Sequence, residues 1–145
     1  MKEPIRVLQV LGTTGLGGAE SRVMDLYRNI DRERVQFDFC SAHLEKKDIL
    51  TKRLKHLADT FTGCRGFGSI TGFRIGRHGA AFFKEHSEYA CVHGHMTSTA
   101  SIYLPEAKRG KIALTAAHAR SAGTEGGVKG MMTKRMRKNL WKKTD

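Results

Sequence analysis

The stretch IRVLQVLGTTGLGGAE, residues 5–20, decides the fold class. It opens with a nearly continuous apolar and β-branched run, which is the pattern of a strand buried on both faces. The run ends in a cluster of glycines, and beyond them Val23, Leu26, Tyr27 and Ile30 recur at the spacing of one helix face. The stretch therefore predicts a strand, a glycine-rich turn and a helix over residues 19–30, which together are half of a βαβ unit.

The same alternation of strand and helix periods continues along the chain. Parallel strands need crossover connections, and the helices between the predicted strands supply them. The sequence therefore predicts an α/β fold, a Rossmann-like doubly wound parallel sheet flanked by helices, in flavodoxin-like strand order. The further strands are expected at residues 35–40, 60–64, 89–93 and 111–116, and the further helices at 46–58, at 73–86 and after a cap at Thr97 or Ser98, where Pro105 should kink or shorten the helix.

Length and composition are those of one ordinary globular domain. The chain has 145 residues, of which 39% are hydrophobic and 28% are charged. No run approaches the roughly 18 apolar residues of a membrane-spanning helix, and the first residues lack the pattern of a signal peptide, so we expect a cytoplasmic protein. The three widely spaced cysteines contain no Cys-x-x-Cys pair, which predicts reduced, mostly buried thiols.

The positive charge is concentrated at the C-terminal end. The formal charge is +12, and residues 129–145 supply +6 of it, from seven basic residues and one acidic residue, Asp145. Such a cluster attracts acidic lipid head groups, nucleic acid or a phosphorylated substrate. An apolar stripe at i, i+4 spacing runs through the cluster at Val128, Met132, Met136 and Leu140. The segment is therefore either a helix that packs on the sheet or on a further domain, or an amphipathic helix that contacts an anionic membrane peripherally through residues 128–143.

In open parallel sheets, ligands bind at the carboxyl ends of the strands, where the strand order reverses. The loop after the first strand contains Gly17, Gly18 and Glu20. Its glycines permit positive φ and close backbone approach, and the helix N-terminus offers N–H groups to an anion, so the loop could cradle a phosphate or a sugar. It is neither a dinucleotide fingerprint, because Glu20 stands where the third glycine would be, nor a P-loop. The alternative is that the glycines only make a tight turn and that Glu20 only favours the helix N-terminus electrostatically.

Polar side chains also follow the fourth and fifth predicted strands. His93 and His95 are two residues apart, so both imidazoles point to the same side of an extended chain. A metal pair with Cys91 as a third ligand is one interpretation, but no motif of recognised spacing accompanies it. We therefore favour a packed His93, a polar site residue at His95, and no metal. His118 and Arg120 could hydrogen-bond a sugar hydroxyl or pair with phosphate, unless they belong only to a surface loop.

Five short motifs, in this order, resemble one family. They are Gly-Gly-Ala-Glu at 17–20, Tyr-Arg-Asn-Ile-Asp at 27–31, Phe-Asp-Phe at 37–39, Val-His-Gly-His-Met at 92–96 and Ala-His at 117–118. Over essentially its whole length the chain resembles the N-terminal domain of family 4 retaining glycosyltransferases of the GT-B fold, especially bacterial capsular and exopolysaccharide enzymes. Close relatives often have Ala-His-Ser-His where this chain has Ala-His-Ala-Arg, so Arg120 stands in place of their second histidine.

The resemblance implies transfer of a sugar from a nucleotide-sugar donor to a lipid-linked or polysaccharide acceptor, with retention and with no obligatory metal or other cofactor. It implies that His118 is a catalytic residue near the donor sugar, that the Gly17-Gly18 loop lies against the donor diphosphate and the acceptor, and that Glu20, His95 and Arg120 also bind substrate. The family's second domain, which holds the donor through a basic pair and a Glu-x7-Glu motif, has no counterpart in residues 1–145. Because the transition state needs both walls of the cleft, we expect this polypeptide alone to have negligible transfer activity.

A function from another class stays open. The charge of +12 and the glycine loop also fit a stand-alone binding module for a phosphorylated or polyanionic ligand. Specific nucleic-acid binding is disfavoured, because the basic residues are not interleaved with the aromatic residues on which bases stack.

Overall fold

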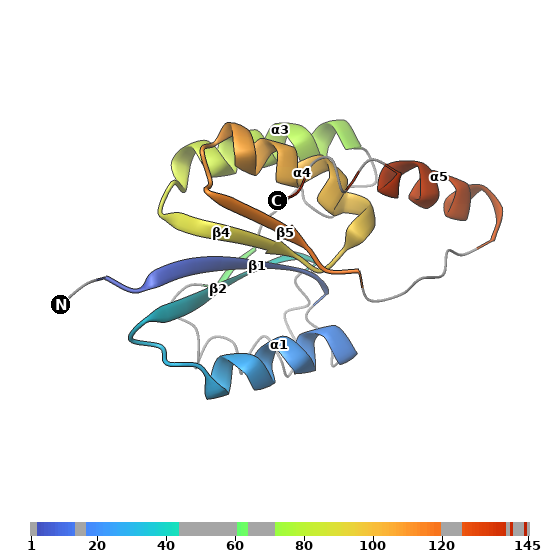
Figure 1. Ribbon diagram of the computed structural model, residues 1–145. Helices are drawn as coiled ribbons and strands as arrows, with labels where there is room; N and C mark the ends of the chain where they lie inside the picture. The colour runs from blue at the N-terminus through green and yellow to red at the C-terminus, as the bar shows by residue number, and fades with distance from the viewer. Residues whose placement is uncertain are drawn as a thin grey trace.

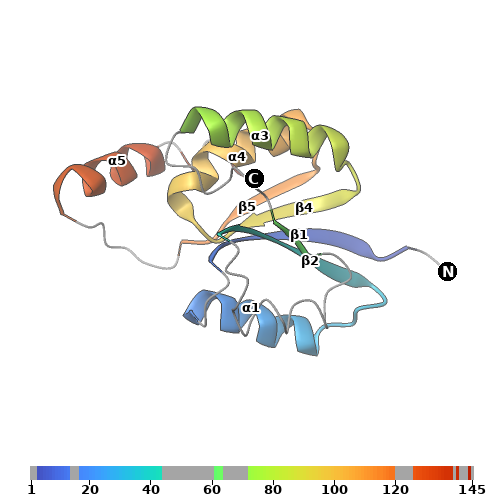
Figure 2. The same ribbon diagram turned by 180° about the vertical axis from the view of Figure 1, so that it is seen from behind.

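The computed structural model describes residues 3–13, 17–43, 61–63, 72–119, 126–138, 140 and 144. Helices cover both faces of one sheet, with α1 (Gly18–Asn29) on one side and α3 (Gly72–Glu85) and α4 (Thr97–Arg109) on the other (Figures 1 and 2). All strand pairings in the described part of the chain are parallel, so the predicted Rossmann-like α/β class is confirmed. The elements are β1 (Ile5–Thr13), α1 (Gly18–Asn29), β2 (Val35–His43), β3 (Phe61–Gly63), α3 (Gly72–Glu85), β4 (Tyr89–Gly94), α4 (Thr97–Arg109), β5 (Leu114–Ala117) and α5 (Gly127–Arg137).

The strand order is β3-β2-β1-β4-β5, so the predicted flavodoxin-like order is wrong. In that order the third strand would pair with β1, whereas here it pairs with β2, and β4 takes the place beside β1. Both orders have the same alternation of strands and helices along the chain, so periodicity could not distinguish them. A strand of three residues also suits the sheet edge, where it presents few unpaired backbone groups. The order reverses between β1 and β4, which makes their carboxyl ends the expected ligand site.

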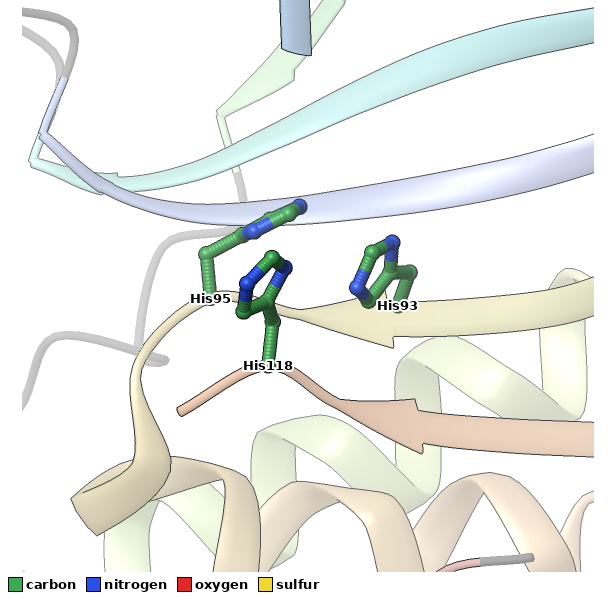
Figure 3. Close-up of side chains that lie close together, drawn as sticks. All are labelled: His93, His95 and His118. Carbon is green, nitrogen blue, oxygen red and sulfur yellow. The ribbon is translucent and has the colours of Figure 1, made fainter. Parts of the chain in front are cut away.

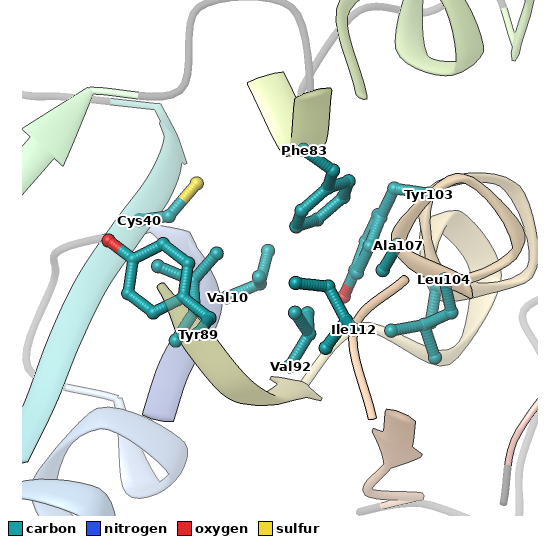
Figure 4. Packing of buried hydrophobic residues seen from close by; sticks show 11 residues of the cluster. Val10, Cys40, Phe83, Tyr89, Val92, Tyr103, Leu104, Ala107 and Ile112 are labelled. Atoms are coloured by element: carbon teal, nitrogen blue, oxygen red, sulfur yellow. The ribbon is translucent and has the colours of Figure 1, made fainter. Parts of the chain in front are cut away.

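Two apolar layers hold the sheet between its helices. Leu8 and Val10 of β1 lie in the larger cluster, with α3 and α4 (Figure 4), and the neighbouring Leu11 lies in a second cluster with α1. Because successive strand residues point to opposite faces, a continuous apolar run is what a strand covered on both sides requires. In the second cluster, Tyr27 of α1 stacks on Phe37 of β2 with ring centroids 5.1 Å apart.

Most predicted elements are found within a residue or two of their expected places. The helices α1 and α3 each begin and end one residue earlier than predicted, and the strand predicted at 60–64 is present as β3. The predicted helix at 46–58 lies outside the described residues. The predicted cap of α4 is wrong, because the N-cap is Met96 and Thr97 is already helical.

Pro105 does not shorten α4, which continues to Arg109. An internal proline removes one helix hydrogen bond and costs about 3 kcal/mol. Around it, however, α4 buries Tyr103, Leu104 and Ala107 completely, and burial of two large side chains offsets a cost of that size. Tertiary packing therefore overrides the local preference.

The strand β5 begins later than predicted, at Leu114 rather than at residue 111. Lys111 has φ +66°, the left-handed conformation that often ends a helix, and its N–H donates to the carbonyl of Lys108. Ile112 donates to the carbonyl of Ala107 and is buried in the core. These residues therefore finish the turn after α4 before the strand starts.

The cysteines do not all match the prediction. Cys40 is completely buried and disulfide-bonded, while Cys91 is half-buried and is not in a disulfide. The prediction of reduced thiols is thus wrong at Cys40, because spacing along the chain does not report distance in the fold.

The helix α5 packs beside the start of α4. Arg137 donates from Nε to Thr97 Oγ1 at 2.6 Å, and Leu140 just beyond the helix packs against the larger core cluster. Within the part of the chain that the structure describes, no helix has the length and apolar character needed to cross a membrane.

Candidate functional site

Backbone hydrogen bonds fix two histidines just beyond the ends of the central strands. His95 N–H donates to the carbonyl of Val10 at 3.0 Å, which extends the β1–β4 ladder by one residue. His118 N–H donates to the carbonyl of Gly94 at 2.8 Å, which extends the β4–β5 ladder in the same way. Both side chains are therefore held by main chain at the edge where ligands bind in this fold.

The strand register brings His93, His95 and His118 together. His93 pairs with Ala116, so His95 lies across from His118, and alternate residues of both strands point to the same face. The ring centroids are 4.2 Å apart for His93 and His95, and 5.8 Å apart from each of these to His118. Figure 3 shows the three imidazoles turned toward one another from the two strand ends. The expectation that His93 and His95 point to one side is confirmed.

His95 is the more buried of the two neighbouring histidines. His95 is only 9% exposed, and its Nε2 donates to Oε1 of the buried Gln9 at 2.8 Å. His93 is half-buried beside it. The third member of the group is His118 from the next strand and not Cys91, the residue suggested by sequence. The pairing of β4 with β5 places His118, and not Cys91, beside the other two histidines, and this pairing could not be predicted from the sequence.

A cavity of about 220 Å³ lies between these histidines and α1. Gln9 and the three histidines form its sheet side, and Arg22, Val23 and Leu26 form its helix side. Its volume is below the roughly 300–1,000 Å³ of a complete small-molecule pocket. The cavity lined by these described residues is therefore smaller than a complete site for a small molecule.

The glycine loop ends at the start of α1. Gly17 is the N-cap and has φ −81°. The carboxylate of Glu20 occupies the space that a Cβ at Gly17 would need, because such a Cβ would lie 2.3 Å from Glu20 Oε2. Glu20 is buried in the first turn, as expected for a carboxylate that favours a helix N-terminus. Gly18 has nothing within 4 Å of a Cβ position, so space is open in front of it. The sequence suggested that glycines in this loop serve to allow positive φ. Gly17 has a negative φ, and among the described glycines only Gly127 has a positive one.

The end of β4 is held closely against α4. A Cβ on Gly94 would lie 2.2 Å from the hydroxyl oxygen of Tyr103, which is completely buried, and its burial raises the pKa of the phenol above its ordinary value. Only glycine allows this approach. Gly94 lies between His93 and His95, so the contact also helps to position the histidines.

The structure brings together three of the predicted features and adds two residues. His95, His118 and the Gly17–Gly18 helix start lie at the same sheet edge, whereas Arg120 lies outside the described residues. Gln9 and Arg22 were not predicted. Gln9 could have been noticed as a polar side chain inside an apolar strand, but Arg22 reads from periodicity as part of the solvent face of α1.

Part of the chain is similar in sequence to a protein that is named as a glycosyltransferase. No family model matches the chain. The chain is similar to the "Putative glycosyltransferase EpsF" of Bacillus subtilis (strain 168), with 31% identity over 90 residues, which is 62% of this chain and 23% of that protein. The matched region thus spans less than a quarter of the relative's length.

Proposed function

We propose that this chain is the acceptor-side domain of a glycosyltransferase. It would move a sugar from a nucleotide diphosphate to a hydroxyl of a lipid-linked or polysaccharide acceptor, with retention and without an obligatory metal, as in family 4 enzymes of the GT-B fold that make capsule or exopolysaccharide. The observation that carries the proposal is the placement of the histidine group on one cavity with Arg22, Val23 and Leu26 of α1, at the point where the strand order reverses. The similarity to a named glycosyltransferase supports the same class.

In this proposal each group has a task that its chemistry allows. His118 is exposed at the cavity rim, where its imidazole can hydrogen-bond a hydroxyl of the donor sugar. The N–H groups at Gly17 and Gly18 face the diphosphate or the acceptor, and the open space at Gly18 allows close approach. His95, held by Gln9, lines the acceptor side, and Glu20 and Arg120 contribute to substrate binding. Arg22 at the cavity mouth adds a cation for an anionic group.

We expect the 145-residue chain alone to show no turnover, because a cavity of this size holds one part of the donor and a second domain would hold the rest. The test compares this chain with the longest product of its reading frame, by measuring release of nucleotide from a panel of nucleotide sugars with and without acceptor. Turnover by the longer product alone supports the proposal. Turnover by the short chain would show that one domain suffices. Absence of turnover in both, with saturable binding of phosphorylated ligands, would favour the binding-module alternative.

Exposed apolar and basic side chains on α5 support a peripheral contact with an anionic membrane through residues 128–143. Val128, Met131 and Met132 are 71%, 67% and 53% exposed. Three basic side chains beside them are also exposed: Lys134, Arg135 and Lys138. The apolar stripe seen in the sequence is thus divided, with Val128 and Met132 exposed and Leu140 packed against the core. An exposed apolar patch with basic neighbours is the pattern of a helix that lies on a lipid surface.

Changing Lys134, Arg135 and Lys138 together to Gln should weaken binding to vesicles that contain phosphatidylglycerol by about 100-fold, because each basic residue near such a surface contributes about 1 kcal/mol. Co-sedimentation with vesicles measures the change. The matched control replaces Arg77 and Lys84, which are exposed on α3, and Lys111, which is exposed in the turn after α4, with Gln and removes the same charge. Equal losses in the two variants would mean that net charge, and not the α5 surface, drives the contact.

A further inference from the structure

We propose that His93, His95 and His118 form a binding site for a borderline transition-metal dication such as Zn²⁺. Each residue offers one imidazole nitrogen, and the three nitrogens all lie within 4.8 Å of one another. In tetrahedral zinc sites with Zn–N distances near 2.0–2.1 Å, ligand nitrogens are about 3.3 Å apart. A small rotation of the side chains would close that difference, since His118 is exposed and His93 is half-buried.

The main chain holds the three ligands in place before any ion arrives. His93 is within β4, and the backbone N–H groups of His95 and His118 extend the parallel ladders by one residue each. The Cα positions are therefore set by the sheet and only side-chain torsions remain to be ordered. Sites built on strands in this way lose little conformational freedom when they bind a ligand.

Gln9 hydrogen-bonds one ring nitrogen of His95, and metal-bound histidines usually have such a hydrogen-bond partner on the nitrogen that does not bind the ion. Its Oε1 accepts a hydrogen bond from His95 Nε2 at 2.8 Å, and both residues are buried. A neutral imidazole that donates from Nε2 carries its lone pair on Nδ1, which is then the nitrogen able to ligate. Such an amide or carboxylate partner fixes the tautomer and orients the ring.

The ligand set determines the class of ion. Three neutral imidazoles favour Zn²⁺, Co²⁺, Ni²⁺ or Cu²⁺ over Mg²⁺ or Ca²⁺, which prefer oxygen ligands. The cavity beside the histidines leaves a fourth position accessible to water or to a ligand. The motif was not recognisable from sequence, because the third histidine comes from the neighbouring strand, 23 positions after His95.

Binding of the ion does not depend on the glycosyltransferase proposal, which requires no metal, and failure of one leaves the other standing. The experiment uses the full 145-residue chain without an affinity tag, stripped of metal and titrated with Zn²⁺ by calorimetry and with Co²⁺ by visible absorption. We expect one ion per chain, and a d–d band typical of nitrogen ligands with Co²⁺. His118→Ala and His93→Ala should each weaken binding by at least about 100-fold, since even outer partners of a metal site contribute 10–100-fold.

His78→Ala is the matched control, because His78 is an exposed histidine on α3, on the opposite side of the sheet from α1 (Figure 1). It should bind Zn²⁺ like the wild type. Circular dichroism of the metal-free variants checks that they fold, and Zn²⁺ should raise the Tm of the wild type and of His78→Ala but not that of His118→Ala. Wild-type affinity in His118→Ala, an equal loss in His78→Ala, or absence of binding at about 1 mM Zn²⁺ by the wild type would overturn the proposal.

Discussion

Replacing His118 by alanine should lower kcat for sugar transfer by about 10²–10³-fold in an active form of the protein. This range is the usual cost of removing one hydrogen-bonding group that acts mainly in the transition state. The proposal places this imidazole, at the rim of the cavity, beside the donor sugar. Initial rates at saturating donor and acceptor measure the change, and KM for the donor should change much less than kcat.

The loss should not come from unfolding. His118 is exposed, and its anchoring bond to Gly94 is made by the backbone N–H, which alanine keeps. The Tm of His118→Ala should therefore equal that of the wild type. His78→Ala, which removes an exposed imidazole from α3, should keep full activity. A His118→Ala variant with wild-type kcat would remove this residue from the proposed mechanism.

Gly94→Ala should destabilise the fold by about 3 kcal/mol, the upper part of the range for an overpacked core. The added methyl group would lie 2.2 Å from the Tyr103 hydroxyl and 3.1 Å from its ring carbon Cζ. Tyr103 is completely buried in the cluster with Phe83 and Leu104 (Figure 4), so a shift of its ring would disturb the packing of the core. Thermal unfolding should show a Tm lower by about 10 °C for a domain of this size.

Gly76→Ala provides a control with the same chemical change. Gly76 is inside α3, and the nearest atom to a Cβ there is Ile102 Cγ2 at 3.8 Å, an ordinary contact. Alanine is the better helix former by up to about 1 kcal/mol, so this variant should be slightly more stable than the wild type. If the Tm of Gly94→Ala equalled that of the wild type, the close approach of α4 to β4 would not require glycine at this position.

The elements of the fold followed well from local patterns. The helix face from Val23 to Ile30 placed α1 within one residue of its position. The patterns that begin at residues 5 and 35 placed the starts of β1 and β2, which end two and three residues later than predicted. The errors occurred where tertiary packing outweighs a local signal. Pro105 stays inside α4 because its neighbours are buried, and Lys111 continues a turn because Ile112 is drawn into the core.

The candidate site was predicted in pieces. The glycine loop, His95 and His118 were recognised separately as features that follow strands, and parallel topology explains why they lie at one edge. The assembled histidine group was not predicted, nor was the hydrogen bond from His95 to Gln9, because these depend on which strands are neighbours and in what register. The assigned roles of Gly17, Gly18, Glu20, His95, His118 and Arg120 stay predictions.

The sequence by itself determined the fold class, because hydrophobic periodicity reflects whether a segment is buried on one face or on two. It also showed that glycines follow the first strand and that histidines follow the fourth and fifth, at the carboxyl edge of the sheet. The strand order, the tight contact of Gly94 with Tyr103 and the grouping of three histidines were decided only by the tertiary structure. The physical reason is that pairing between parallel strands is made by backbone groups common to all residues, so the choice of neighbour depends on how the helices pack across the sheet.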